Sequence, residues 1–169
     1  MTSSASIEMK VVAVLQRTGV PFEVLDCDPD YADTVAFCER YGYALDTCGN
    51  TIIVGSKKEP KQYSACVIKA STRLDVNKAV RRLMGVSRLS FASSDETVAL
   101  TGMMIGGVTP FVLPPGLPIY VDHKLMDLED VILGSGSRSS KIKVAPQVFH
   151  ALPSAQIVPG LAFSHAAPG

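Results

Sequence analysis

Residues 101–111 read Thr-Gly-Met-Met-Ile-Gly-Gly-Val-Thr-Pro-Phe, and this stretch is the most informative in the chain. Gly102, Gly106 and Gly107 let the backbone take positive φ or approach another molecule closely, whereas Pro110 fixes φ and offers no N–H. The composition suits neither a helix interior nor a central strand. It predicts a rigid, shaped loop, called the glycine loop below, whose main-chain N–H and C=O groups can bind a small polar group. The alternative is an ordinary connection between strands that packs closely.

Outward from the glycine loop, apolar spacing and turn residues predict interleaved helices and strands. The sequence Ser-Ser-Asp-Glu at 93–96 is a capping box and predicts a short helix that leads into the loop. Another helix is expected to begin at Ser6 and to end at Gly19. Further helices are expected over 33–41 and 74–84, and strands over 21–26, 51–54, 63–69, 119–122, 131–133 and 142–144.

These elements predict an α/β chain of the α+β type, with a mixed, curved β-sheet surrounded by helices. The connections between strands are too short and varied for a doubly wound sheet. The 169 residues are expected to form a single domain, 1–169, which can bury a core without disulfides or a metal. From about residue 160 the chain is rich in small residues, Gly and Pro, so a loose tail is expected there.

The charge balance argues against a general nucleic-acid binder. The chain has sixteen basic and sixteen acidic residues, so its formal net charge is zero, and 47% of its residues are hydrophobic. A neutral chain can still carry local basic faces that contact an RNA backbone, here the turn over 57–61 and the helix face with Lys78, Arg81 and Arg82. Of the aromatic residues, Tyr63 alone lies near these charges in the sequence, where it could stack on a base.

No metal, cofactor or membrane span is expected. The cysteines at 27, 38, 48 and 66 form no Cys-x-x-Cys pair, and the three histidines lie far downstream. Buried or reactive free thiols in a reducing cytoplasm are the favoured interpretation, and a catalytic role for Cys48 is the alternative, because Cys48 lies close to Asn50. The polar start of the chain shows no signal peptide, and no apolar run approaches the ~18 residues that span a bilayer, so a cytoplasmic location is expected.

The glycine loop is similar to the signature of the YbaK/prolyl-tRNA editing domain family. The family's Gly-x-x-x-Pro element corresponds here to Gly106 through Pro110. Three further segments resemble family elements in the same order: a helix that opens with Leu-Asp-Val-Asn-Lys at 74–78, a strand at 117–122, and a glycine-rich turn with an arginine at 134–138. The resemblance covers roughly residues 30 to 158.

The resemblance implies a YbaK-like fold and an aminoacyl-tRNA deacylase that acts in trans on a mischarged small amino acid. The implied partners are the acceptor end of an aminoacyl-tRNA and an aminoacyl-tRNA synthetase. The glycine-rich residues of the loop, with Thr109 and Pro110, are expected to line the main cavity, with Asn50 and the turn at 134–138 on its rim. The expected catalytic residues are Asn50, Gly106 and Gly107, and the expected substrate-binding residues are Gly102, Met104, Thr109, Pro110, Phe111, Gly136, Arg138 and Lys141.

Ester cleavage requires a stabilised oxyanion or a well-held carbonyl, and backbone N–H groups of the glycine loop can supply this. Carbonyls of the loop can hold the α-ammonium group of the substrate. The apolar residues Met103, Met104, Ile105 and Phe111 either wall a small side-chain pocket or belong to the core. Arg138 is the candidate for a bidentate contact with phosphate.

Two positions depart from the family pattern. Many members carry Lys-Thr-Leu where this chain has Asn50-Thr51-Ile52, so a cation is replaced by an amide that donates a weaker hydrogen bond or merely shapes the turn. Lys141 stands near the place of a family acidic residue. It compensates for the missing lysine if the two positions are close in space; otherwise it is a solvated turn residue.

Three functions compete. The first is a trans-editing hydrolase, and the second is an aminoacyl-tRNA-binding module that keeps the pocket but has lost hydrolysis at Asn50. The third is a regulatory or nucleic-acid-binding protein unrelated to tRNA charging. Neutral net charge and the absence of a helix-turn-helix pattern argue against the third.

Overall fold

The computed structural model describes residues 4–164. The helices are α1 (Ser4–Thr18), α2 (Thr34–Tyr41), α3 (Arg81–Met84) and α4 (Ser94–Thr101). The strands are β1 (Phe22–Asp26), β2 (Gly49–Ser56), β3 (Tyr63–Lys69), β4 (Thr72–Leu74), β5 (Leu89–Phe91), β6 (Ile119–Asp122), β7 (Val131–Gly134), β8 (Ser140–Val144), β9 (Ala155–Val158) and β10 (Ala162–Ser164). Of the helices within these residues, none is long and apolar enough to cross a membrane.

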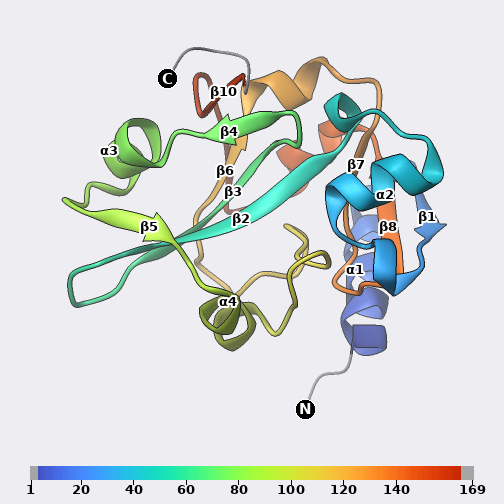
Figure 1. Ribbon diagram of the computed structural model, residues 1–169, viewed down its shortest axis with the longest axis horizontal. Helices are drawn as coiled ribbons and strands as arrows, with labels where there is room; N and C mark the ends of the chain where they lie inside the picture. The colour runs from blue at the N-terminus through green and yellow to red at the C-terminus, as the bar shows by residue number, and fades with distance from the viewer. Residues whose placement is uncertain (1–3, 165–169) are drawn as a thin grey trace.

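The larger of two main sheets has five strands in the order β5-β2-β3-β6-β9. β2 and β3 form an antiparallel hairpin, whereas β6 runs parallel to both β3 and β9. Figure 1 shows this sheet on the left, with α3 and β4 above it and α4 below. The mixed sheet with helices around it confirms the expected α+β fold class.

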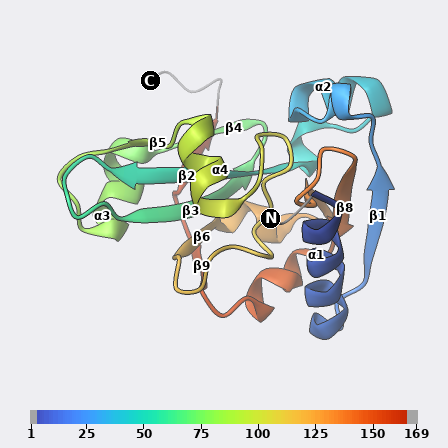
Figure 2. The same cartoon turned by 90° about the horizontal axis from the view of Figure 1, so that it is seen from below.

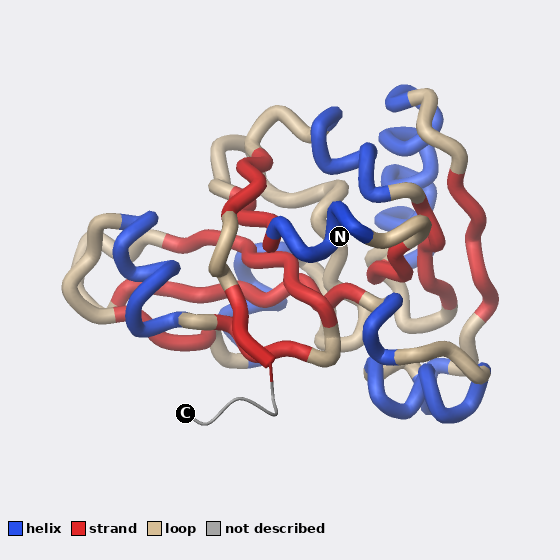
Figure 3. The backbone as a smooth tube through the Cα atoms, turned by 90° about the horizontal axis from the view of Figure 1, so that it is seen from above, coloured by secondary structure: helices blue, strands red, loops and turns tan. Residues whose placement is uncertain are grey.

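The smaller sheet is antiparallel, in the order β1-β8-β7. It stands on the other side of the molecule beside α1 and α2, so the strands fall into two groups in Figure 3. A parallel bridge between Cys48 and Ile132 connects the segment before β2 with β7. The two sheets therefore meet at the start of β2.

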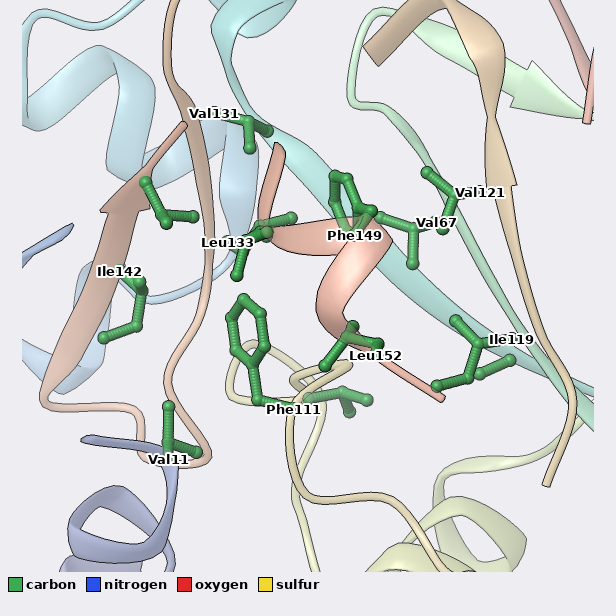
Figure 4. Close-up of a cluster of buried hydrophobic side chains, with 14 of the residues drawn as sticks. Val11, Val67, Phe111, Ile119, Val121, Val131, Leu133, Ile142, Phe149 and Leu152 are labelled. Carbon is green, nitrogen blue, oxygen red and sulfur yellow. The ribbon is translucent and has the colours of Figure 1, made fainter. Parts of the chain in front are cut away.

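The main core lies between α1, the smaller sheet and the middle of the larger sheet. Ile7, Val11 and Leu15 recur at helical spacing and are buried, which confirms the expected helix, and Gly19 follows it with a φ of 73°. Figure 2 shows α1 alongside β8. Figure 4 places Phe111 of the glycine loop among core side chains, near Leu133. The loop is therefore anchored in the core at its end.

The capping box before α4 is present as expected. Ser93 Oγ accepts a hydrogen bond from Glu96 N at 3.0 Å, and Ser93 N donates to Glu96 Oε1 at 3.1 Å. Gly102 ends the helix in the left-handed conformation. α4 thus leads the chain into the glycine loop.

The helix expected over 74–84 is wrong at its start. Leu74 pairs with Ala162 as the last residue of β4, and the Asp75 side chain accepts a hydrogen bond from Lys78 N at 3.2 Å. The chain then makes a π-helical turn, Val76–Val80, before α3. Val76 and Val80 are still buried, so the apolar spacing was correct, but strand pairing prevails over helix propensity at Leu74.

The loose tail expected from about residue 160 is not observed as far as Ser164. Leu161 is fully buried, and its carbonyl accepts a hydrogen bond from Asp75 N at 2.9 Å. β10 pairs with β4 immediately afterwards. The burial of Leu161 and the pairing of β10 with β4 order this segment despite its turn-rich composition. Residues 165–169 lie outside the described part of the chain.

Leu161→Ala should therefore destabilise the protein by about 2–5 kcal/mol, because the change leaves a cavity in a packed cluster. Urea unfolding measures the loss. Met9→Ala is the control, since Met9 is exposed and its truncation should change stability by less than about 0.5 kcal/mol. Equal effects of the two changes would show that the segment after Pro159 contributes nothing to the fold.

Candidate functional site

A cavity of about 390 Å³, called the first cavity, lies where the two sheets meet. Its wall comes from the start of β2, the N-terminal end of α2, the glycine loop, β7 and one residue of β8. The wall is largely apolar, and its apolar side chains include Phe37, Ile53, Val108, Ile132 and Leu133.

Lys141 is the cation among the described lining residues of the first cavity. It lies on β8, is buried, and donates hydrogen bonds from Nζ to the carbonyls of Ala32 at 2.5 Å and of Gly106 at 2.8 Å. Burial lowers the pKa of Lys141 below the ordinary lysine value. The solvated turn residue considered from the sequence is thus wrong, because β8 already begins at Ser140 and carries Lys141 into the interior.

Asn50 also lines the first cavity, from β2. Thr34 Oγ1 donates a hydrogen bond to Asn50 Oδ1 at 2.6 Å, which fixes the orientation of the amide. The amide N–H groups of Asn50 then remain as donors. Asn50 and Lys141 line the same cavity, although they lie far apart in the sequence.

Arg138 fastens the glycine loop to the segment before α2. Its guanidinium donates to Asp33 Oδ1 at 3.1 Å, to the Ile105 carbonyl at 2.6 Å and to the Pro29 carbonyl at 2.8 Å. Three of its five donor positions are engaged in this way. Arg138 lies outside the lining of the first cavity. Its hydrogen bonds hold the glycine loop in position, and they occupy donors that a bidentate contact with phosphate would use.

Glycines allow the close approach between the loop and the turn that follows β7. A Cβ on Gly106, whose φ is +89°, would collide with the Arg138 guanidinium and lie 3.0 Å from Asp33 Oδ1. A Cβ on Gly134 would collide with the Val108 carbonyl, and Gly136 N donates to the Gly107 carbonyl at 2.7 Å. These glycines let two backbone segments pack in contact.

The structure brings only part of the expected set to the cavity. Asn50, Gly106, Gly134 and Lys141 line it. The other expected residues do not line it, so the expectation that most of the glycine loop faces the cavity is wrong. Gly102 caps α4, and Met104 is exposed. The remaining residues are buried or contact the loop from outside the cavity: Gly107, Thr109, Pro110 and Phe111 are buried, and Gly136 and Arg138 hydrogen-bond to the loop. The loop turns back into the core after Val108, and Thr109 to Phe111 serve as its anchor.

Sequence reasoning missed four polar lining residues, Asp33, Thr34, Thr51 and Thr97. Thr34 begins α2, and nothing in the local pattern links it to Asn50. Thr51 follows Asn50 on β2, where the neighbouring motif could have drawn attention to it. Its Oγ1 is buried and has no hydrogen-bond partner within residues 4–164, which marks it as an unsatisfied polar atom in the wall.

The cavity has no evident protein nucleophile. All four cysteines are free and buried, and burial with the neighbouring Cys38 thiol raises the pKa of Cys48 to about 12. A thiol with such a pKa is inert at neutral pH. Asp33 is paired with Arg138, and the described residues include no cluster of three potential metal ligands. The arrangement therefore offers a buried ammonium group and a side-chain amide that can donate hydrogen bonds to a carbonyl oxygen.

Comparisons with known proteins identify relatives of this chain. "Multifunctional Ser/Thr-tRNA deacylase ProXp-y" of Escherichia coli is 25% identical over 133 residues, which cover 78% of each chain. "Putative Cys-tRNA(Pro)/Cys-tRNA(Cys) deacylase EbsC" of Enterococcus faecalis is 23% identical over 128 residues, which cover 75% of this chain and 76% of that protein.

Two solved structures share the fold. "Hypothetical protein APE2540" has a TM-score of 0.80 at 24% identity, covering 91% of this chain and 99% of its own. A "putative trans-editing enzyme for prolyl tRNA synthetase" has a TM-score of 0.75 at 23% identity, covering 90% and 95%. The family model of the aminoacyl-tRNA editing domain matches residues 28–152, a span that holds Lys141, Asn50 and the whole glycine loop. The chain therefore belongs to the aminoacyl-tRNA editing domain family.

Proposed function

We propose that the protein is an aminoacyl-tRNA deacylase that acts in trans and hydrolyses the ester of a mischarged small amino acid. The observation that carries this proposal is the buried ammonium group of Lys141 on the wall of an apolar cavity that the Asn50 side chain also lines. Family membership and relatives named as tRNA deacylases support the reaction class.

Lys141 supplies the charge that the family lysine supplies elsewhere. An ammonium group has three donors, and two of those on Lys141 are held by the carbonyls of Ala32 and Gly106. The third is free to donate to the carbonyl oxygen of the ester, where negative charge develops as the tetrahedral intermediate forms. The two protein carbonyls hold the ammonium in place beforehand.

Asn50 provides the second donor to the reacting ester. Its Nδ2 points away from the bond that Thr34 makes with Oδ1 and is available to the ester or the ribose. Water then adds to the carbonyl carbon, the ester C–O bond breaks, and a proton passes to the departing ribose oxygen. No side-chain nucleophile is required, which fits the raised pKa of Cys48.

The wall of the first cavity favours a small amino acid. Ile53, Val108 and Leu133 surround an apolar space, and Thr51 Oγ1 adds one unpartnered polar atom to it. A short side chain fits this space, and a hydroxyl or thiol group would satisfy Thr51. Alanine, serine, threonine and cysteine are the candidate amino acids.

An aminoacyl-tRNA synthetase is the proposed partner, since a structural neighbour carries a name that links it to prolyl tRNA synthetase. A cytoplasmic location is proposed with it, because aminoacyl-tRNA is used there and the four free thiols suit a reducing compartment.

Deacylation of a panel of charged tRNAs tests the proposal. The native protein should release alanine, serine, threonine or cysteine from tRNA faster than the spontaneous rate and leave leucine and phenylalanine in place. Filter binding of the same tRNAs runs in parallel. Binding without any release would contradict the deacylase and favour the binding module that keeps the pocket.

Lys141→Met should lower kcat/KM by about 10- to 100-fold, because a charge-assisted hydrogen bond contributes roughly 1.5–3 kcal/mol. The native activity should also fall as pH rises through the pKa of Lys141, which burial places below the ordinary value of 10.5. Lys141→Arg should move this alkaline limit upward, since guanidinium stays charged. Rates are corrected for spontaneous hydrolysis at each pH.

The free energy of unfolding should change with pH in the direction opposite to the activity. Since the folded chain releases the Lys141 proton at a lower pH than the unfolded chain, the free energy of unfolding rises between the two pKa values. Urea unfolding over that range separates loss of activity from loss of fold. An activity profile that Lys141→Met leaves unchanged would remove Lys141 from the mechanism.

Asn50→Ala should lower kcat/KM by about 2- to 10-fold, the loss of a neutral hydrogen bond. Asn50→Lys should not restore activity, because it places a second cation in the cavity that already holds Lys141. Thr34→Val is the matched control: it releases Asn50 Oδ1 while keeping the amide, so its effect should be smaller. A tenfold gain with Asn50→Lys would mean that Lys141 does not replace the missing charge.

A further inference from the structure

A second cavity, of about 360 Å³, adjoins the first. The two share Asn50 and Ile52 on β2 as lining residues. The second cavity extends from there to β4, β5 and β10, which lie together in Figure 1 on the side of β2 away from α2. Asn50 and Ile52 thus border both cavities, and the first cavity lies on the other side of these residues from β4 and β10.

The wall of the second cavity carries an arginine stacked on an aromatic ring. Arg73 and Phe163 are directly opposite each other in the β4–β10 pair, and Arg73 Cζ lies 5.4 Å from the centre of the Phe163 ring. Arg73 is exposed and forms no ion pair within residues 4–164. A guanidinium at this distance from an aromatic ring makes a cation–π contact and keeps its N–H donors for other partners.

A second ring, Phe91, borders the same cavity from β5 and is 58% exposed. Together with Phe163 it places two aromatic rings on the wall of one cavity. Asn77, also on the cavity wall, is exposed and offers both a donor and an acceptor. The carboxylate on this wall, Asp75, is engaged with Lys78 N and caps the π-helical turn.

A third cavity nearby is less suited to an anion. It contains Lys57 and Lys61, but Lys61 forms an ion pair with Glu96 at 3.4 Å, and Phe91 is its only ring. The second cavity instead combines an unpaired arginine, two rings and a side-chain amide.

We propose that the second cavity binds the terminal nucleotides of the tRNA acceptor end, an inference that rests on the proposed deacylase function. Unstacked bases of single-stranded RNA bind by stacking on aromatic rings, and arginine forks pair with phosphate. A terminal base stacks against Phe163 or Phe91, Arg73 contacts a backbone phosphate, and Asn77 reaches a base edge. The ribose that carries the ester then lies at Asn50 and Ile52, between the two cavities.

Binding of a short RNA that ends in cytidine, cytidine and 2-aminopurine tests this directly. Stacking quenches the fluorescence of 2-aminopurine, so the native protein should quench it on binding. Arg73→Ala and Phe163→Leu should each weaken binding by about 5- to 100-fold, the range measured for lost base stacking. Phe163→Leu keeps an apolar side chain, which protects the β4–β10 pair against unfolding.

Arg40→Ala is the matched control, because Arg40 also lies over aromatic rings, Tyr31 and Tyr41, yet lines neither cavity. It should leave RNA binding unchanged. The kcat/KM for charged tRNA should fall with Arg73→Ala, whereas the methyl ester of the same amino acid should be cleaved as by the native protein.

The outcomes separate the two proposals. If the native protein deacylates tRNA and both variants at Arg73 and Phe163 retain full RNA binding and activity, the second cavity is not the nucleotide site while the deacylase stands. If the native protein deacylates nothing, the proposed function fails, and quenching that depends on Arg73 and Phe163 would still support an RNA-binding site.

Discussion

The ammonium group of Lys141, held between the carbonyls of Ala32 and Gly106, is the contact on which the site depends. It joins β8, the segment before α2 and the glycine loop at one buried point. A buried cation is costly unless hydrogen-bonded, and here backbone oxygens provide the bonds without neutralising the charge. Burial lowers the pKa of Lys141, which reflects the remaining cost, and under the proposed function the positive charge faces a substrate oxygen.

The glycine loop is rigid for reasons that lie outside its own sequence. Arg138 binds it to Asp33 and to the Pro29 carbonyl on one side, and Phe111 anchors it in the core on the other. Between these points the backbone of Gly106 and Val108 faces the cavity. Two basic residues of one turn and strand, Arg138 and Lys141, thus shape the loop from opposite faces. A substrate meets a preorganised surface rather than one that must fold around it.

The same positions explain how the chain can tolerate Asn50 where many family members have lysine. A positively charged side chain can enter a cavity from any strand that borders it. β8, which carries Lys141, borders the first cavity, as β2 does. The chemistry expected of the family is therefore compatible with the substitution. Under the proposed function, Asn50, oriented by Thr34, is a neutral donor in a cavity whose cation comes from a distant part of the sequence.

Local patterns in the sequence were sufficient for most elements: the capping box at 93–96, the apolar spacing of Ile7, Val11 and Leu15, and the hairpin of β2 and β3. The glycine loop also pointed to the family, because its Gly106-to-Pro110 element and three further segments resemble the family signature in the same order. The sequence could not show that residues 109–111 are buried in the core instead of lining the cavity, nor that the C-terminal segment pairs with β4 as β10. The burial of a residue depends on which other segments of the chain pack against it, and local sequence does not determine that.

Tertiary structure alone decided which cation enters the site and which rings border the second cavity. Lys141 lies 91 positions from Asn50 in the numbering, and Arg73 is 90 positions from Phe163. Each pair meets because strands distant in sequence lie in one sheet or border one cavity. Local composition sets the conformation of a segment, whereas a site is a set of distances between segments, and only the packed chain defines those.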